Sequence, residues 1–122
     1  MTTEKKEELD NLAKLLKVLG HPMRLAMIEE LRERDWCVCE LAAKLNLNNP
    51  TASKHLSLLK SVNIITMERK GTQVVCKLVM PCVIEMIHCA NNAIDVENNL
   101  QKDKVEENTT LINCKNKCSI NN

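Results

Sequence analysis

The sequence is nearly free of aromatic side chains. Its 122 residues include one Trp and no Tyr or Phe. Proteins that hold single-stranded nucleic acid stack its bases on aromatic rings, so this composition argues against single-strand binding and against an RNA partner. The core must be built from aliphatic residues and Met, and a hydrophobic content of 44% is enough for one domain of modest size.

Long apolar runs are also missing. No run is long enough to span a membrane, and no N-terminal stretch resembles a signal peptide. We therefore expect a cytoplasmic protein with no membrane partner. Its seven cysteines are then not expected to form structural disulfides, and an odd number fits a fully paired set poorly. Some are better explained as soft metal ligands or redox thiols, and others as small buried residues.

The charge is small in total but unevenly distributed. The net charge is +1, yet residues 51–80 carry five basic residues and one acidic residue. Residues 1–35 and 81–122 each carry more acidic than basic residues. Positive charge focused on one segment is typical of proteins that approach the phosphates of a DNA duplex.

Residues 48–60, Asn-Asn-Pro-Thr-Ala-Ser-Lys-His-Leu-Ser-Leu-Leu-Lys, predict a short helix with a polar face. Asn49 is expected to cap this helix, and Pro50 suits its first position because the missing N–H costs nothing there. Leu56 and Leu59 supply an apolar stripe for the core. The remaining side chains have the size and polarity to reach base edges and phosphates. We call this predicted helix the reading helix. Its expected DNA contacts are Asn49, Thr51, Ser53, Lys54 and His55.

The flanking segments predict a winged helix-turn-helix. A helix at about 38–45 lies upstream, across a tight polar turn at 46–48. Downstream, β-forming residues at 64–70 and 73–79 predict a basic hairpin, or wing. The expected wing contacts to DNA are Lys70 and Gln73. The fold class is therefore mainly α with a β-hairpin wing (α+β), in the order ααααββα.

Apolar residues at helical spacing predict three further helices. They cover residues 3–19, with Thr3 as the cap, residues 22–34, and residues 81 to about 97. The first and last of these offer more apolar surface than a small winged domain needs. We expect a homodimer through these two helices, which would place two reading helices about one DNA turn apart.

Three segments resemble the arsenic-repressor (ArsR/SmtB) family of winged-helix metal sensors, over roughly residues 9–95. They are residues 19–25 (Leu-Gly-His-Pro-Met-Arg-Leu), residues 37–41 (Cys-Val-Cys-Glu-Leu) and residues 53–60 (Ser-Lys-His-Leu-Ser-Leu-Leu-Lys). The second is similar to the family's Cys-Val-Cys-Asp-Leu metal box, and the third to its Ser-x-His-Leu-x-x-Leu reading helix. The resemblance implies a homodimeric repressor that binds an inverted repeat of double-stranded operator DNA when metal-free and lets go when metal binds. It implies no organic cofactor.

Cys37 and Cys39 are the candidate metal ligands. Paired thiolates select soft ions, here As(III), Sb(III), Cd(II), Pb(II) or Zn(II). We expect both on the third helix, where residues two apart point about 200° from each other. One ion could join both sulfurs only if the start of that helix bent, and this strain would disturb the reading helix. The alternative is two inert buried cysteines.

Further ligands are expected from the tail. Residues 1–97 form the predicted DNA-binding and dimerisation domain, and residues 98–122 a flexible tail that carries Cys114 and Cys118. Both tail cysteines are possible additional ligands. Three sulfurs would favour arsenite or antimonite, and four would favour cadmium, lead or zinc. Cys76 is expected to be a strand residue of the wing. Cys82 and Cys89 lie seven apart on the last predicted helix and are expected to pack in the core; the alternative is a thiol site across the dimer, with His88 nearby.

Two other functions remain open at this stage. One is a redox or persulfide sensor of the same fold, although the second helix has no Cys to form the required bridge. The other is a zinc-stabilised winged-helix interaction module. An enzyme is not expected, because the chain has no Cys-x-x-Cys redox motif and no evident pairing of a nucleophile with a base.

Overall fold

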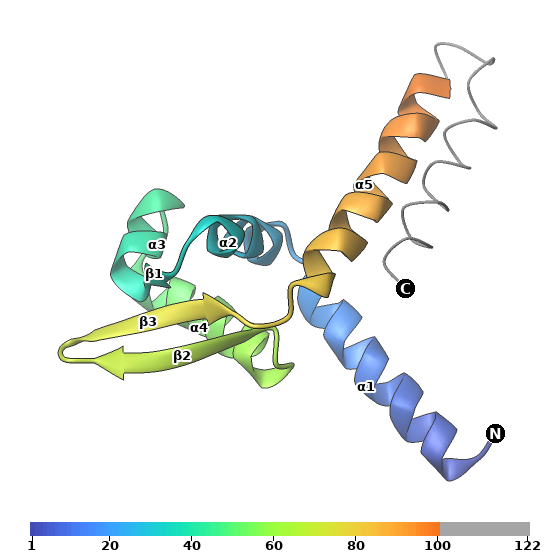
Figure 1. Cartoon of the computed structure of the whole chain (residues 1–122), viewed down its shortest axis with the longest axis horizontal. Helices are drawn as coiled ribbons and strands as arrows, with labels where there is room; N and C mark the ends of the chain where they lie inside the picture. Colours follow the sequence, from blue (N-terminus) through green and yellow to red (C-terminus); the bar gives the residue numbers. More distant parts are fainter. Residues whose placement is uncertain (101–122) are drawn as a thin grey trace. The chain divides into compact units, whose positions relative to one another are not determined.

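The computed structural model describes residues 1–100, with side chains to residue 95, and gives a winged helix-turn-helix (Figure 1). Its elements are α1 (Thr3–Leu19), α2 (Pro22–Glu33), β1 (Trp36–Cys37), α3 (Val38–Lys44), α4 (Asn49–Ser61), β2 (Ile65–Lys70), β3 (Gln73–Leu78) and α5 (Cys82–Leu100). The chain divides into one compact unit of Met1–Pro81 and a second that begins at Cys82. The predicted order of five helices and a hairpin is confirmed. The tail cysteines, Cys114 and Cys118, lie outside the described residues.

The sheet has a third strand that the sequence did not predict. Trp36 and Cys37 form β1, which pairs antiparallel with β3, so that the strand order is β1-β3-β2. Trp36 faces Cys76, and Met67 of β2 faces the same Cys76 from the other side. Two residues are too short to show an alternating pattern, and this strand forms only because β3 is present to pair with it.

Two predicted helix caps were wrong by one residue. Thr2, not Thr3, caps α1, and its Oγ1 accepts a hydrogen bond from the backbone N–H of Lys5 at 3.2 Å. Asn48, not Asn49, caps α4, and its Oδ1 accepts from the N–H of Thr51 at 2.8 Å. Each true cap precedes an identical residue in the chain, and only the extended backbone of the cap position distinguishes the two.

The core of the first unit is aliphatic, as predicted. Its fully buried side chains come from α2, α3, α4, the segment after α4, and the sheet: Met27, Ile28, Leu41, Leu56, Leu59, Ile64, Ile65 and Cys76. By contrast, Leu9, Leu12 and Leu16 of α1 are 40–49% exposed. This apolar face of α1 is the surface that the predicted homodimer would cover. None of the helices within residues 1–100 combines the length and apolar character needed to cross a bilayer.

Candidate nucleic-acid interface and thiol pair

A short turn, residues 45–48, connects α3 to α4 in the helix-turn-helix. Asn46 adopts a left-handed backbone with φ of 55°, which Asn tolerates better than most residues. The N–H of Leu47 then donates to the carbonyl of Ala42 at 2.8 Å, which satisfies one of the last carbonyls of α3. Leu41 of α3 and Leu56 of α4 are both fully buried, so α4 is anchored by its apolar side.

The opposite side of α4 is polar and accessible. Asn49, Lys54 and Ser57 are exposed, whereas Thr51 and Ser53 are half-buried. All of them except Ser57 lie in the first two turns, where a reading helix meets base edges and phosphates. The predicted contacts Asn49, Thr51, Ser53 and Lys54 therefore lie on one helix and within its N-terminal half, although their binding to DNA stays a prediction.

His55 differs from its neighbours because it contacts the interior of the fold. Its Nδ1 accepts a hydrogen bond from Nε of Arg24 at 3.2 Å, and its ring centroid lies 4.6 Å from that of His21. The pKa of His55 is lowered, first by burial and then by the nearby positive charge of His21, Arg24 and Lys54. The predicted DNA contact of His55 is untested, but its Nδ1 is already occupied.

The wing places polar side chains on both sides of its turn. Lys70 and Gln73 pair directly across the hairpin and are exposed. Gly71 between them has φ of 65°, a conformation that favours glycine, and Nε of Arg69 donates to its carbonyl at 3.5 Å. The hairpin turn projects beyond α3 and α4 (Figure 1), as a segment that lies along a DNA backbone must do.

Cys37 occupies a different position from the one expected. It is the N-cap of α3, with φ of −80° and ψ of 155°, rather than a residue within that helix. Cys37 as a whole residue is 4% exposed, and its Sγ donates to Oε1 of Glu40 at 2.9 Å. This hydrogen bond, together with burial, raises the pKa of the Cys37 thiol, and the same contact lowers the pKa of the Glu40 carboxyl. The expectation that two ligands share a regular helix was therefore wrong.

Cys39 lies in the first turn of α3 and is exposed. Its Sγ accepts a hydrogen bond from Nδ2 of Asn49 at 3.8 Å, a normal length for a weak bond to sulfur. Asn49 is the first residue of α4, so this contact connects the exposed thiol to the start of the reading helix. The sequence placed both residues in the site without showing that they touch.

A small charged network surrounds the buried thiol. Oε2 of Glu40 lies 3.6 Å from Nη2 of Arg34, and the Arg34 guanidinium lies 3.5 Å above the centre of the Trp36 ring. Nε1 of Trp36 donates to the carbonyl of Glu30 at 3.0 Å. Sequence reasoning missed Glu40 and Arg34. The spacing of Cys37 and Glu40 matches that of a capping box, in which a residue three positions after the cap turns back toward it, and this signal could have revealed Glu40.

The described residues offer only part of a metal site. No three His, Cys, Asp or Glu side chains among them converge closely enough to hold an ion. The donor chemistry nevertheless suits a soft ion, because Cys37 and Cys39 supply two thiols within one turn of chain. An ion that used both would need Cys37 to lose its proton and its bond to Glu40.

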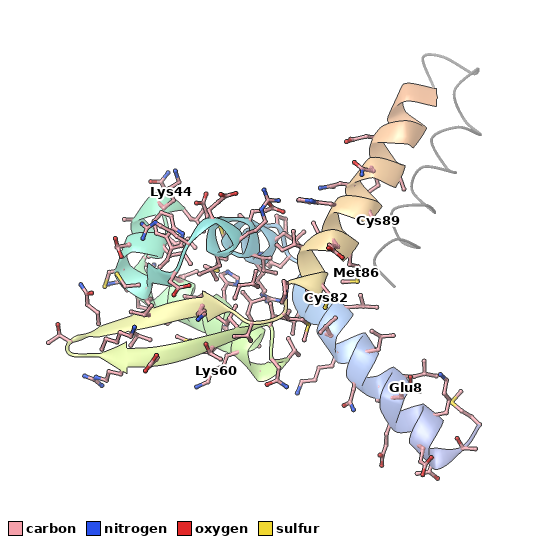
Figure 2. The ribbon with its side chains drawn as sticks, in the orientation of Figure 1. Glu8, Lys44, Lys60, Cys82, Met86 and Cys89 are labelled. Atoms are coloured by element: carbon pink, nitrogen blue, oxygen red, sulfur yellow. The ribbon has the colours of Figure 1, made fainter. Side chains whose placement is uncertain are left out.

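The other described cysteines are Cys76 of β3 and Cys82 and Cys89 of α5. Cys76 is fully buried in β3, as predicted, and burial raises its pKa to about 11, with a smaller effect from Cys37. Such a thiol is inert at neutral pH. Cys82 and Cys89 lie along α5, with Met86 between them (Figure 2). Cys82 is exposed and Cys89 is half-buried.

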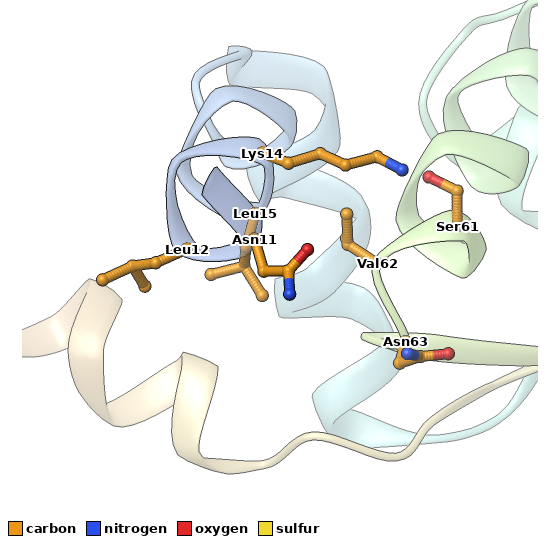
Figure 3. A pocket seen from close by; sticks show the side chains of 7 residues that line it. All are labelled: Asn11, Leu12, Lys14, Leu15, Ser61, Val62 and Asn63. Atoms are coloured by element: carbon orange, nitrogen blue, oxygen red, sulfur yellow. The ribbon is translucent and has the colours of Figure 1, made fainter. Parts of the chain in front are cut away.

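One hollow lies in the first unit between α1 and the end of α4. It has a volume of about 510 Å³ and is open to solvent. The side chain of Lys14 extends toward Ser61 across it (Figure 3). Its other lining residues are Asn11, Leu12, Leu15, Val62 and Asn63. The thiol pair does not line it.

Comparisons with known proteins agree with this geometry. The model of the family "Bacterial regulatory protein, arsR family" matches residues 21–66. The HTH-type transcriptional repressor SmtB of Mycobacterium tuberculosis is 40% identical over 73 residues, which are 60% of this chain and 54% of that protein. The chain thus spans about half the length of that repressor. The biofilm growth-associated repressor of Xylella fastidiosa is 35% identical over 79 residues, 64% of this chain and 69% of that protein.

A solved structure shows the same fold. The homodimeric winged helix-turn-helix DNA-binding domain Mb0332 of Mycobacterium bovis, described as a possible ArsR-family transcriptional regulator, superposes with a TM-score of 0.69 at 25% identity. The match covers 78% of this chain and 88% of that one. The winged arrangement of helices and hairpin is therefore shared along most of the described chain.

Proposed function

Since the chain belongs to the arsR family of bacterial regulatory proteins, we propose that it is a homodimeric transcriptional repressor released from operator DNA by a thiophilic metal or metalloid ion. The observation that carries the proposal is the position of the thiol pair. Cys37 caps α3, Cys39 lies in its first turn, and the exposed thiol of Cys39 is hydrogen-bonded to Asn49 at the start of α4. A ligand on the Cys39 sulfur would therefore act directly on a side chain of the reading helix.

The DNA side of the proposal rests on α4 and the wing. The exposed Lys54 lies in the N-terminal half of α4, and Lys70 lies at the hairpin turn. Together they offer cations to phosphates while the shorter polar residues of α4 reach the bases. A second copy of the chain, joined through the exposed leucines of α1 and through α5, would present the same elements to the other half of an inverted repeat.

The ion side rests on the two thiols. A thiophilic ion that binds Cys37 replaces the proton of its thiol. The hydrogen bond that Sγ now donates to Glu40 is then lost. It also takes up sulfur lone pairs on Cys39, which weakens the bond from Asn49. Both changes act at the start of α3 or α4. Suitable ions are As(III), Sb(III), Cd(II), Pb(II) and Zn(II), with Cys114 and Cys118 as candidate further ligands.

The proton of Cys37 competes with the ion for the sulfur, so the affinity for the ion depends on pH. The raised pKa of Cys37 means that its thiol is protonated at neutral pH. An ion must displace that proton, so the affinity for the ion falls as the pH falls. The Glu40 contact therefore protects the metal-free, DNA-binding form of the protein against weakly thiophilic ions.

We predict that Lys54→Ala weakens DNA binding and flattens its dependence on salt. Each cation that neutralises a phosphate contributes about 0.9 to the slope of log affinity against log salt concentration, so the slope falls by about one for each bound copy of Lys54. The measurement uses fluorescence anisotropy with a duplex selected from a random pool. Lys6→Ala is the matched control, because Lys6 is an exposed lysine of α1 and belongs neither to α4 nor to the wing. An unchanged slope in Lys54→Ala would contradict the proposed docking.

A further inference from the structure

Two histidines and an arginine meet where α2 begins and α4 passes it. His21 is the N-cap of α2, and its Nδ1 accepts from the N–H of Met23 at 3.1 Å. Arg24 lies in the first turn of α2, and its Nε donates to Nδ1 of His55 on α4 at 3.2 Å. The rings of His21 and His55 are 4.6 Å apart at an angle of 52°. All three side chains are partly buried.

Arg24 connects two helices that are distant in sequence. While Nε donates to His55, Nη1 donates to the carbonyl of Val18 in the last turn of α1 at 2.9 Å. The guanidinium of Arg24 thus connects the reading helix, α4, to the last turn of α1. The exposed apolar face described above belongs to the same helix α1.

This bond requires a neutral imidazole. An arginine side chain has only donors and stays charged at every accessible pH. Nδ1 of His55 must therefore be the acceptor, and protonation of the ring removes that acceptor and places a second cation against the first. We propose that His55 is a positioning residue for the reading helix, and that protonation of His55 weakens DNA binding in mild acid.

The charges around His55 support this direction. His21 and Arg24 act on it from the start of α2, and Lys54 acts from α4 itself. All three are basic, and no carboxylate of α1, α3 or β2, the other elements packed on α4, is among the charged groups that act on it. Together with burial they hold the pKa of His55 below the ordinary value for histidine. The bond is therefore formed at neutral pH, and its contribution to stability is lost as the pH falls through the lower, folded-state pKa.

The opposite role for His55 makes the opposite prediction. A histidine that contacted a phosphate would bind DNA more tightly when protonated, because the gain of a positive charge strengthens the contact. The sign of the pH effect thus distinguishes a positioning residue from a DNA contact. The inference rests on the proposed DNA binding but does not involve the thiols or an ion.

The test measures the affinity of the full chain for the selected duplex from pH 8.0 to 5.5, with reductant and chelator and at constant ionic strength. We expect the wild type to lose affinity about fivefold or more over this range. His55→Gln, whose amide oxygen can still accept from Arg24 but does not titrate, is expected to show a much flatter profile. His21→Asn keeps an N-cap side chain and removes the second histidine, and its profile is expected to stay as steep as that of the wild type.

A second measurement needs no variant at position 55. The imidazole resonances of the wild type are titrated by NMR with and without duplex, with His21→Asn used for assignment. If protonated His55 binds DNA less well, linkage requires that DNA lowers the pKa of His55 further. A rise of this pKa on binding, or affinity that increases in acid, would overturn the inference, as would an equally steep profile in His55→Gln. Absence of duplex binding at every pH would instead defeat the proposed function itself.

Discussion

Cys37→Ser and Cys39→Ser are expected to bind DNA as the wild type does and to lose the response to ions. A serine at either position keeps a small polar side chain, and at position 37 its hydroxyl can still donate to Glu40, which accepts from the thiol at 2.9 Å. A hydroxyl does not hold a soft ion. The wild type is expected to lose DNA affinity by about 5- to 150-fold on ion binding, which is the usual range of coupling between two sites.

The measurement compares the dissociation constant for the selected duplex with and without each ion, in each variant. Cys82→Ser is the matched control, because Cys82 is an exposed cysteine on α5, outside α3. The control is expected to respond as the wild type does. A full response in both α3 variants would place the sensing site elsewhere in the chain, and a lost response in Cys82→Ser alone would place it on α5.

Leu56→Ala is expected to destabilise the fold by about 2–5 kcal/mol, since it opens a cavity in a fully buried position. Small domains have about 5–15 kcal/mol of stability in total, so this loss removes a large part of it. The measurement is the midpoint of urea unfolding at pH 7.5, together with the slope of the transition. Leu58→Ala, at a half-buried position two residues later, serves as the control and is expected to cost less.

The result bears on the reading helix because Leu56 lies on its buried face. Leu56 and Leu59 anchor α4 against the rest of the core, while Lys54 and Ser57 are exposed. Equal destabilisation by Leu56→Ala and Leu58→Ala would mean that α4 is seated in another rotation. In that case the proposal that the polar side chains of α4 contact DNA would also be wrong.

The elements of the fold were predictable because they depend on local patterns. Apolar residues at helical spacing located all five helices, and a Gly-centred turn between two β-forming runs located the hairpin. The caps at Thr2 and Asn48 were missed by one residue because each is followed by an identical residue. The strand β1 was missed because its two residues show no period of their own.

The contacts within the site were less predictable. Cys37 and Cys39 could be singled out as a thiol pair, but the extended backbone of Cys37 depends on its pairing with Val75 in β3. The bonds that Cys37 donates to Glu40 had a local signal in the capping-box spacing. The bond between Arg24 and His55 joins residues 31 positions apart, and no local pattern encodes it.

The position of Cys37 also changes the route by which ion binding would affect the reading helix. If both cysteines lay on a regular helix, an ion would have to bend α3 to bridge them. Instead Cys37 lies before the helix, where the backbone is already extended, and the cost of binding would be the loss of the hydrogen bond from the Cys37 thiol to the Glu40 carboxylate. In the proposed mechanism, the effect of the ion would pass to α4 through the contact between Cys39 and Asn49 rather than through a distorted helix.

The most direct test of ion-controlled release follows the ion, the thiols and the DNA together. Reduced full-length protein on a labelled selected duplex is titrated anaerobically with arsenite, antimonite, cadmium, lead and zinc, while Trp36 emission, thiolate–metal absorbance and duplex anisotropy are recorded. Trp36 adjoins Cys37 and lies under Arg34, the partner of Glu40, so its emission reports on the buried thiol. One or a few ions are expected to change emission and absorbance stoichiometrically and to release the duplex at the same equivalence point. Silence from all five ions, or a stoichiometric change in emission with the duplex still bound, would contradict the account.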